Sequence, residues 1–99
     1  MFDSIVLFSA HSLDYALVAH QSHCTGTDTK KGDMDSIEDC ASACRGEFQL
    51  FTFGLDTAGN SRCGSNGKCQ CWCEAETEDF KCKTQEVHTG YNLYAFKGK

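Results

Sequence analysis

Residues 68–74, KCQCWCE, place three cysteines at alternate positions around a glutamine and a tryptophan. Sulfur atoms at this density can bind a metal, cycle between thiol and disulfide, or form permanent cross-links. Structural zinc sites use C-x₂₋₄-C pairs, a spacing that Cys40-x₃-Cys44 has. The cysteines of residues 68–74 do not have this spacing, and alternate positions in a strand place their sulfurs about 7 Å apart. The histidines form no H-x₃₋₅-H pair, and no thioredoxin-like C-x-x-C motif is present. We therefore interpret these cysteines as one wall of a disulfide-bonded core, without a metal or a cofactor.

The composition is typical of a small disulfide-rich domain. The chain has 99 residues with 8 cysteines and a formal net charge of −5. A domain of this size has a modest hydrophobic core, which disulfides commonly supplement in secreted proteins. The acidic charge argues against a nucleic-acid partner. The sequence has no run of about 20 apolar residues, so we predict no membrane-spanning helix. We expect a secreted, extracellular protein.

The first ten residues, MFDSIVLFSA, are apolar and stand apart from the rest of the chain. Asp3 and the lack of Lys or Arg make this segment incomplete as a signal peptide. Three interpretations remain open: a signal remnant, an extra edge strand, or a segment that docks on another molecule. Residues 11–99 are expected to form the single domain.

The remaining pattern predicts an α+β fold. Apolar, β-prone segments predict strands at residues 13–20, 47–54, 68–74 and 91–97, and turn-rich residues 24–33 predict a loop. Residues 35–46 predict a helix, capped by Asp35 or Ser36 and stopped by Gly46. We expect a curved antiparallel sheet of about five strands, one helix packed across it, and four disulfides.

Strand geometry divides the cysteine-rich segment between two faces of the sheet. Successive side chains alternate, which puts Cys69, Cys71 and Cys73 on one face and Gln70, Trp72 and Glu74 on the other. Cys40 and Cys44 share one face of the predicted helix, so that face can form two disulfides with the strand.

Trp72 points away from the proposed helix and is the centre of a candidate binding site. An exposed aromatic ring beside amide and carboxylate groups can stack on a sugar or anchor a protein. Either Tyr91 or Tyr94 can share the face of Trp72, but not both. The candidate ligand-binding residues are Trp72, Gln70, Glu74, Phe51, Phe53 and Tyr94. The alternative is that Trp72 packs beneath the N-terminal segment or a loop, and that Phe51 and Phe53 belong to the core.

The order of these features over residues 13–97 resembles the PAN/apple module. The matching features are Cys24, Cys40-x₃-Cys44, Phe48 to Phe51, the strand from Cys69 to Cys73, Cys82, and Tyr91 to Tyr94. The resemblance implies a non-catalytic extracellular module that binds protein or carbohydrate. It also implies four pairings: Cys24–Cys82, Cys40–Cys73, Cys44–Cys71, and a local Cys63–Cys69 bridge that departs from the family's six-cysteine pattern.

The sequence carries no nucleophile elbow or phosphate-binding glycine motif, and we expect no enzyme activity. A binding or adhesion role is favoured, with a carbohydrate slightly ahead of an extracellular protein as the ligand. A structural subunit that self-assembles through Met1–Ala10 is the alternative. A third possibility is a toxin or inhibitor that presents residues 25–34 or 55–68 to a target.

Overall fold

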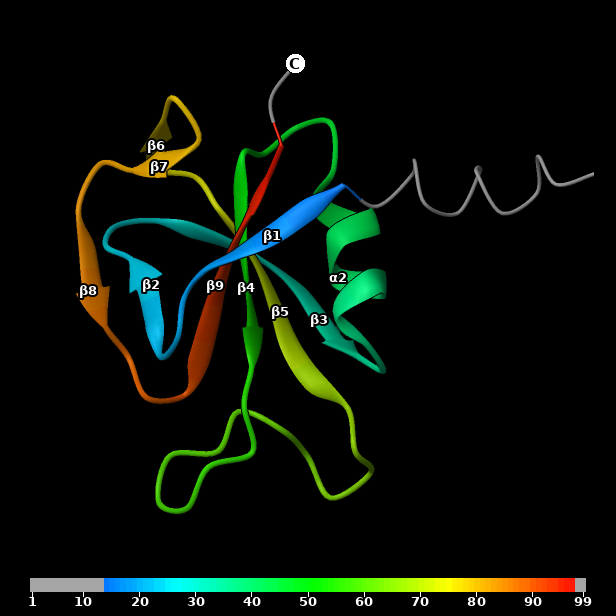
Figure 1. Ribbon diagram of the computed structural model, residues 1–99. Helices are drawn as coiled ribbons and strands as arrows, with labels where there is room; N and C mark the ends of the chain where they lie inside the picture. Colours follow the sequence, from blue (N-terminus) through cyan, green and yellow to red (C-terminus); the bar gives the residue numbers. More distant parts are fainter. Residues whose placement is uncertain (1–13, 98–99) are drawn as a thin grey trace, which may run out of the picture.

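The computed structural model describes residues 14–97, which form an α+β fold with one helix and an open five-stranded antiparallel sheet (Figure 1). The strand order in this sheet is β1-β9-β4-β5-β3, and β2-β8 and β6-β7 form two further two-stranded sheets. The elements are β1 (Tyr15–Ala19), β2 (Ser22–Cys24), β3 (Asp28–Met34), α2 (Ile37–Cys44), β4 (Leu50–Gly54), β5 (Cys69–Glu74), β6 (Thr77–Glu78), β7 (Lys81–Cys82), β8 (Gln85–Val87) and β9 (Tyr91–Phe96). The predicted fold class is confirmed.

The four predicted strands correspond to β1, β4, β5 and β9, but the fifth strand of the sheet was not predicted. Residues 24–33 were expected to be a loop, which is wrong because β3 begins at Asp28 and pairs with β5. β3 is an edge strand with mostly exposed side chains, including Lys30 and Lys31. A polar edge strand has little hydrophobic alternation, so the pattern that reveals other strands is missing from its sequence.

Helix α2 begins as its sequence predicts. The Ser36 hydroxyl accepts a hydrogen bond from the Asp39 backbone N–H at 3.1 Å, and Glu38 and Asp39 lie in the first turn. The helix is followed by Gly46 with φ of 92°, a left-handed conformation that favours glycine. Its face toward the sheet buries Cys40, Ala41 and Cys44 completely.

Two disulfides join this helix to β5, with a pairing that corrects the prediction. Cys40 pairs with Cys71 and Cys44 with Cys73, at Cα separations of 5.4 and 5.5 Å. The expected pairs, Cys40–Cys73 and Cys44–Cys71, are wrong because α2 runs in the same direction as β5. Four helical residues advance about 6 Å and two strand residues about 7 Å, so both bridges form in parallel.

The other two disulfides agree with the expected pairing. Cys24–Cys82 joins β2 to β7 with a sequence separation of 58, and Cys63–Cys69 closes a short loop at the start of β5. Cys24 packs with Leu50 and Leu93 in a small core on the sheet face opposite α2. The larger core lies between the sheet and α2 and contains both helix-to-strand disulfides.

Some expectations concern residues that the structure does not describe. The signal remnant, extra strand and docking segment proposed for residues 1–10 lie outside residues 14–97. Among the described residues, no helix has both the length and the apolar character that a membrane crossing requires.

Candidate functional site

The side chains of β5 alternate between the two faces of the sheet. Cys71 and Cys73 are buried against the helix, whereas Trp72 pairs in register with Thr52 on the opposite face. Thr52 in turn pairs with Leu93 of β9, which belongs to the small second core. The described structure therefore places Trp72 on the side away from α2, where it is partly exposed.

A hydrogen-bond network fixes the Trp72 side chain. Its indole Nε1–H donates to Gln70 Oε1 at 3.0 Å, and the Tyr91 hydroxyl donates to the same oxygen at 2.7 Å. Gln70 thus bridges two aromatic rings from different strands, since Tyr91 begins β9. Burial is the largest influence on the Tyr91 hydroxyl and raises its pKa, so the hydroxyl remains a donor at neutral pH.

Two cations flank these rings. Lys30 Nζ lies 5.6 Å from the centroid of the Trp72 ring, and Arg62 Cζ lies 5.7 Å from that of Tyr91. Lys30 is directly opposite Trp72 in the β3–β5 pair, whereas Arg62 comes from the loop between β4 and β5. We call the group Gln70, Trp72, Tyr91, Lys30 and Arg62 the Trp72 platform.

Histidines extend the row of rings beyond Tyr91. His88 lies 4.8 Å from Tyr91 and 4.9 Å from His23, measured between ring centroids. His23 Nε2 lies 2.7 Å from Glu86 Oε1, within hydrogen-bond distance. Burial, followed by the neighbouring His23 and Arg62, lowers the pKa of His88, which favours its neutral form next to Tyr91.

Glu74 lies on the same face but cannot contact a ligand. It is 0% exposed, and its carboxyl oxygens accept hydrogen bonds from the Cys24 N–H at 3.0 Å and the Thr52 hydroxyl at 3.1 Å. Burial and the facing Asp28 carboxyl raise the pKa of Glu74 to about 8. Asp28 Oδ1 is also buried, with no hydrogen-bond partner in the described part of the chain. Glu74 is a structural group, which corrects its predicted role in binding.

Three other predicted ligand residues belong to the core on the helix side. Phe51 is fully buried, and its ring stacks on Tyr94 with centroids 5.1 Å apart. Phe53 and Tyr94 are each 8% exposed and lie in the same cluster as the helix-to-strand disulfides. Their assignment to the site of Trp72 was therefore wrong, and the alternative that Phe51 and Phe53 form core is correct.

Three members of the Trp72 platform, Tyr91, Lys30 and Arg62, are not among the residues predicted for the site, although Lys30 and Arg62 were considered as possible polar contacts from loops. Tyr91 was considered, but alternation showed only that it and Tyr94 point to opposite faces, because the pairing register of β9 was unknown. Lys30 lay in the segment expected to be a loop, and Arg62 reaches the site from a long connection. Lys30 lies beside Trp72 because residues 28–34 form an edge strand, and the sequence of that strand lacks the hydrophobic alternation that would have predicted it.

The cysteines of β5 and α2 have a structural role in the described fold. The sulfurs of Cys40, Cys44 and Cys71 lie within 4.8 Å of one another, but all three are oxidised in disulfides. A disulfide sulfur is not the thiolate that a zinc site requires. The Trp72 platform instead offers ring faces, an amide and two cations, which suit recognition of a ligand by stacking and hydrogen bonding.

Comparison with known proteins gave no relative: no protein-family model, curated protein or solved structure matches this chain.

Proposed function

We propose that this chain is a secreted, non-catalytic binding module, similar to a PAN/apple domain, that recognises carbohydrate at the Trp72 platform. The observation that carries the proposal is a partly exposed indole held by Gln70 on the sheet face opposite the helix. The four disulfides support an oxidising, extracellular location.

Stacking on Trp72 supplies the apolar part of the interaction. The ring is already oriented through Nε1, so a ligand does not have to order it on binding. Lys30 lies over this ring, and an approaching sugar would displace its ammonium group. An exposed cation–π contact contributes about 0.5–1 kcal/mol, which new hydrogen bonds from Lys30 to sugar hydroxyls can offset.

The proposal is tested by glycan-array screening followed by calorimetry with the oxidised protein and its Trp72→Ala variant. Loss of the indole should weaken binding at least about tenfold, or about 1.4 kcal/mol, and leave all four disulfides in place. Val87→Ala is the matched control, because Val87 is 77% exposed on β8 and outside the platform. Equal glycan binding by both variants would show that Trp72 is not part of the glycan site. Binding to proteins but to no glycan would show that the ligand is a protein and not a carbohydrate.

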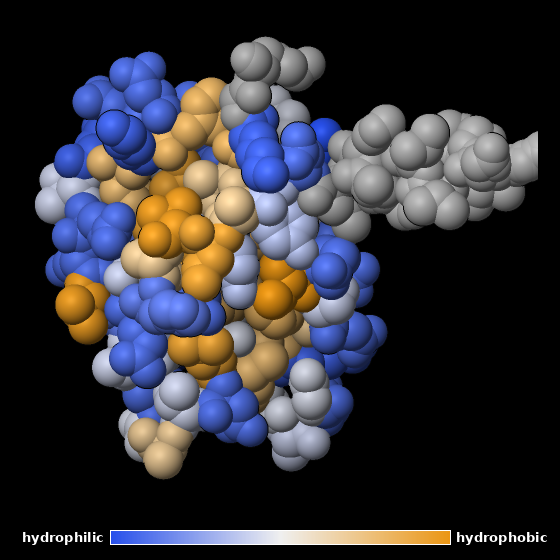
Figure 2. Space-filling view, viewed as in Figure 1, coloured by the Kyte–Doolittle hydropathy of each residue, from blue (hydrophilic) through white to orange (hydrophobic). Residues whose placement is uncertain are grey.

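Assembly is the second candidate, and the exposed edge of the sheet favours it. Among the described strands, β1 pairs only with β9, and its residues Leu17 and Val18 are 43% and 47% exposed. Figure 2 shows hydrophobic residues gathered on the face that β1 crosses. The opposite edge, β3, carries Lys30, Lys31 and a register shift, features that discourage strand addition. β1 also has a register shift, between Leu17 and Ala19, but it carries no charged residue, so its edge is less protected.

In this second candidate, a second copy of the chain adds a strand to β1. Sedimentation velocity over a range of protein concentrations tests it, with Leu17→Lys as the variant that places a charge on the edge. Association that Leu17→Lys abolishes and Val87→Lys does not would support assembly. A full-length protein that remains monomeric at every concentration would rule it out.

A further inference from the structure

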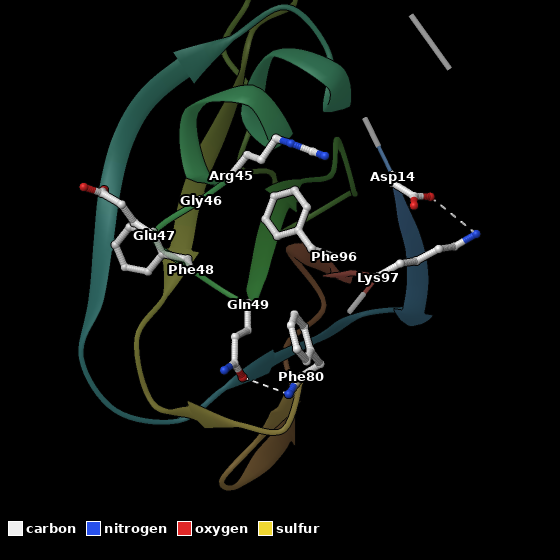
Figure 3. Close-up of a pocket in the computed structure, with 9 residues that line it drawn as sticks. All are labelled: Asp14, Arg45, Gly46, Glu47, Phe48, Gln49, Phe80, Phe96 and Lys97. Atoms are coloured by element: carbon white, nitrogen blue, oxygen red, sulfur yellow. Dashed lines mark hydrogen bonds and ion pairs between the residues drawn. The ribbon is translucent and has the colours of Figure 1, made fainter. Parts of the chain in front are cut away.

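A cavity lies at the opposite end of α2 from its N-cap, away from the Trp72 platform. Its volume is about 490 Å³, within the range of about 300–1,000 Å³ that is typical of ligand sites. Three phenylalanines line it, Phe48 after the helix, Phe80 between β6 and β7, and Phe96 at the end of β9 (Figure 3). We call this cavity the phenylalanine pocket.

A tight hairpin turn places Phe80 in the pocket wall. Its φ is 59°, in the left-handed region that bulky side chains rarely adopt, and Asp79 before it has φ of 52°. The Phe80 N–H donates to Gln49 Oε1 at 2.8 Å, which ties this turn to the segment after α2. The ring is nonetheless 40% exposed. Asp79 and Phe80 are the two loop residues of the β6–β7 hairpin, and a type I′ turn has positive φ at both of these positions. The turn therefore accounts for this conformation, and it leaves a large apolar side chain partly exposed at the pocket wall.

Chain connectivity identifies an occupant. Asp14 lines the pocket and pairs with Lys97 at 3.7 Å, so the preceding residues 1–13 join the described fold at the rim of this cavity. Their run Ile5–Phe8, IVLF, is fully apolar and includes an aromatic ring. Asp14 follows Phe8 by six residues, and an extended chain advances at most about 3.6 Å per residue. That length allows the run to turn back into the pocket.

We propose that Ile5–Phe8 docks in the phenylalanine pocket of its own chain and that Phe80 packs over it. Docking within one chain is favoured because a short connection to the fold gives an effective concentration in the mM range. Burial of these side chains against three phenylalanine rings removes apolar surface from water on both sides. This inference does not rest on carbohydrate binding. If Met1–Ala10 occupies the phenylalanine pocket, a strand that adds to the β1 edge has to come from another segment.

Heteronuclear NMR of the oxidised chain, with and without residues 1–10, tests the proposal. At about 50 μM, well below the effective concentration of the tether, deletion should shift the amide signals of Gly46, Gln49 and Phe80. A synthetic peptide of residues 1–10, added to the shortened chain, should return these signals toward their full-length positions. Phe80→Ala should weaken this peptide at least about tenfold, and Val87→Ala should leave its affinity unchanged.

Two results would overturn the proposal. Pocket signals that coincide with and without residues 1–10 would show that the segment does not occupy the cavity. The shifts could instead appear only when the concentration of the full-length protein approaches about 1 mM, with a dimer detected by sedimentation. That result would show that the segment in the pocket comes from a second copy of the chain. The deletion and peptide measurements decide the matter even if Phe80→Ala fails to fold.

Discussion

At the scale of single residues, the Glu74 carboxyl is the least expected group in the fold. It is fully buried, faces Asp28 across the β3–β5 pair, and has a pKa raised to about 8. Burial is the main cause, and repulsion from a second carboxyl adds to it. Burial also raises the pKa of Asp28. The pair is therefore most stable in a protonated form.

This burial predicts a pH dependence of stability. A raised folded-state pKa means that the unfolded chain releases its proton first, so the free energy of unfolding falls as pH rises from 4.5 toward 8. Glu74→Gln keeps a neutral group in place and should flatten this fall, which urea unfolding at several pH values measures. Glu78→Gln, an exposed position on β6, is the control. An equally steep fall in the Glu74→Gln and control variants would contradict the account.

At the scale of elements, a contact at the end of β4 positions two residues of the Trp72 platform, Arg62 and Gln70. A Cβ added at Gly54 would lie 2.7 Å from the Arg62 carbonyl oxygen and 3.1 Å from the Gln70 backbone nitrogen. These are backbone atoms, which cannot move aside as the end of a side chain can. Gly54 thus permits the close approach that brings Arg62 and Gln70 to Tyr91.

Gly54→Ala is accordingly predicted to lower the free energy of unfolding by about 1–3 kcal/mol, because it overpacks this contact. It should also weaken glycan binding, since Arg62 and Gln70 have to shift. Gly64→Ala is a milder control, because its Cβ would approach only the end of the Asn66 side chain at 3.0 Å. Thermal unfolding and calorimetry measure the two effects. Normal stability and normal binding in Gly54→Ala would show that the contact is unimportant.

The elements also show how far sequence reasoning reaches. Alternation of side chains placed Trp72 on the correct face and the cysteines of β5 on the other, because each follows from geometry within one strand. The helix-to-strand pairing was wrong because the sequence carries no direct signal for the direction of α2 relative to β5. Tyr94 was misassigned for a similar reason, since the face it occupies depends on the register of β9 with β4.

At the scale of the whole molecule, four disulfides connect a fold whose cores are small. Two join the helix to the sheet, and Cys24–Cys82 secures the second core on the other face. Cys63–Cys69 closes only a short loop, with a sequence separation of 6 against 58 for Cys24–Cys82. A disulfide that closes a longer loop restricts the unfolded chain more strongly and therefore stabilises the fold more.

Removing these two bridges should therefore have unequal effects. The chain-entropy model gives about 4 kcal/mol for the loop closed by Cys24–Cys82 and about 2 kcal/mol for the loop closed by Cys63–Cys69. Paired alanine substitutions at each bridge, followed by denaturant unfolding, compare them directly. Buried Cys24 adds a packing loss to the first variant. Equal stabilities, or a larger loss at Cys63–Cys69, would contradict this ordering.

The central claim, that Trp72 contacts the ligand, has a direct readout because Trp72 is the single tryptophan of the chain. The decisive measurement is a tryptophan fluorescence titration of the unmodified oxidised protein with oligosaccharides, paired with calorimetry on the same samples. We predict a saturable change in Trp72 emission with the same affinity as the heat signal. A saccharide that binds by calorimetry without altering Trp72 emission, or a complete lack of saccharide binding, would contradict it.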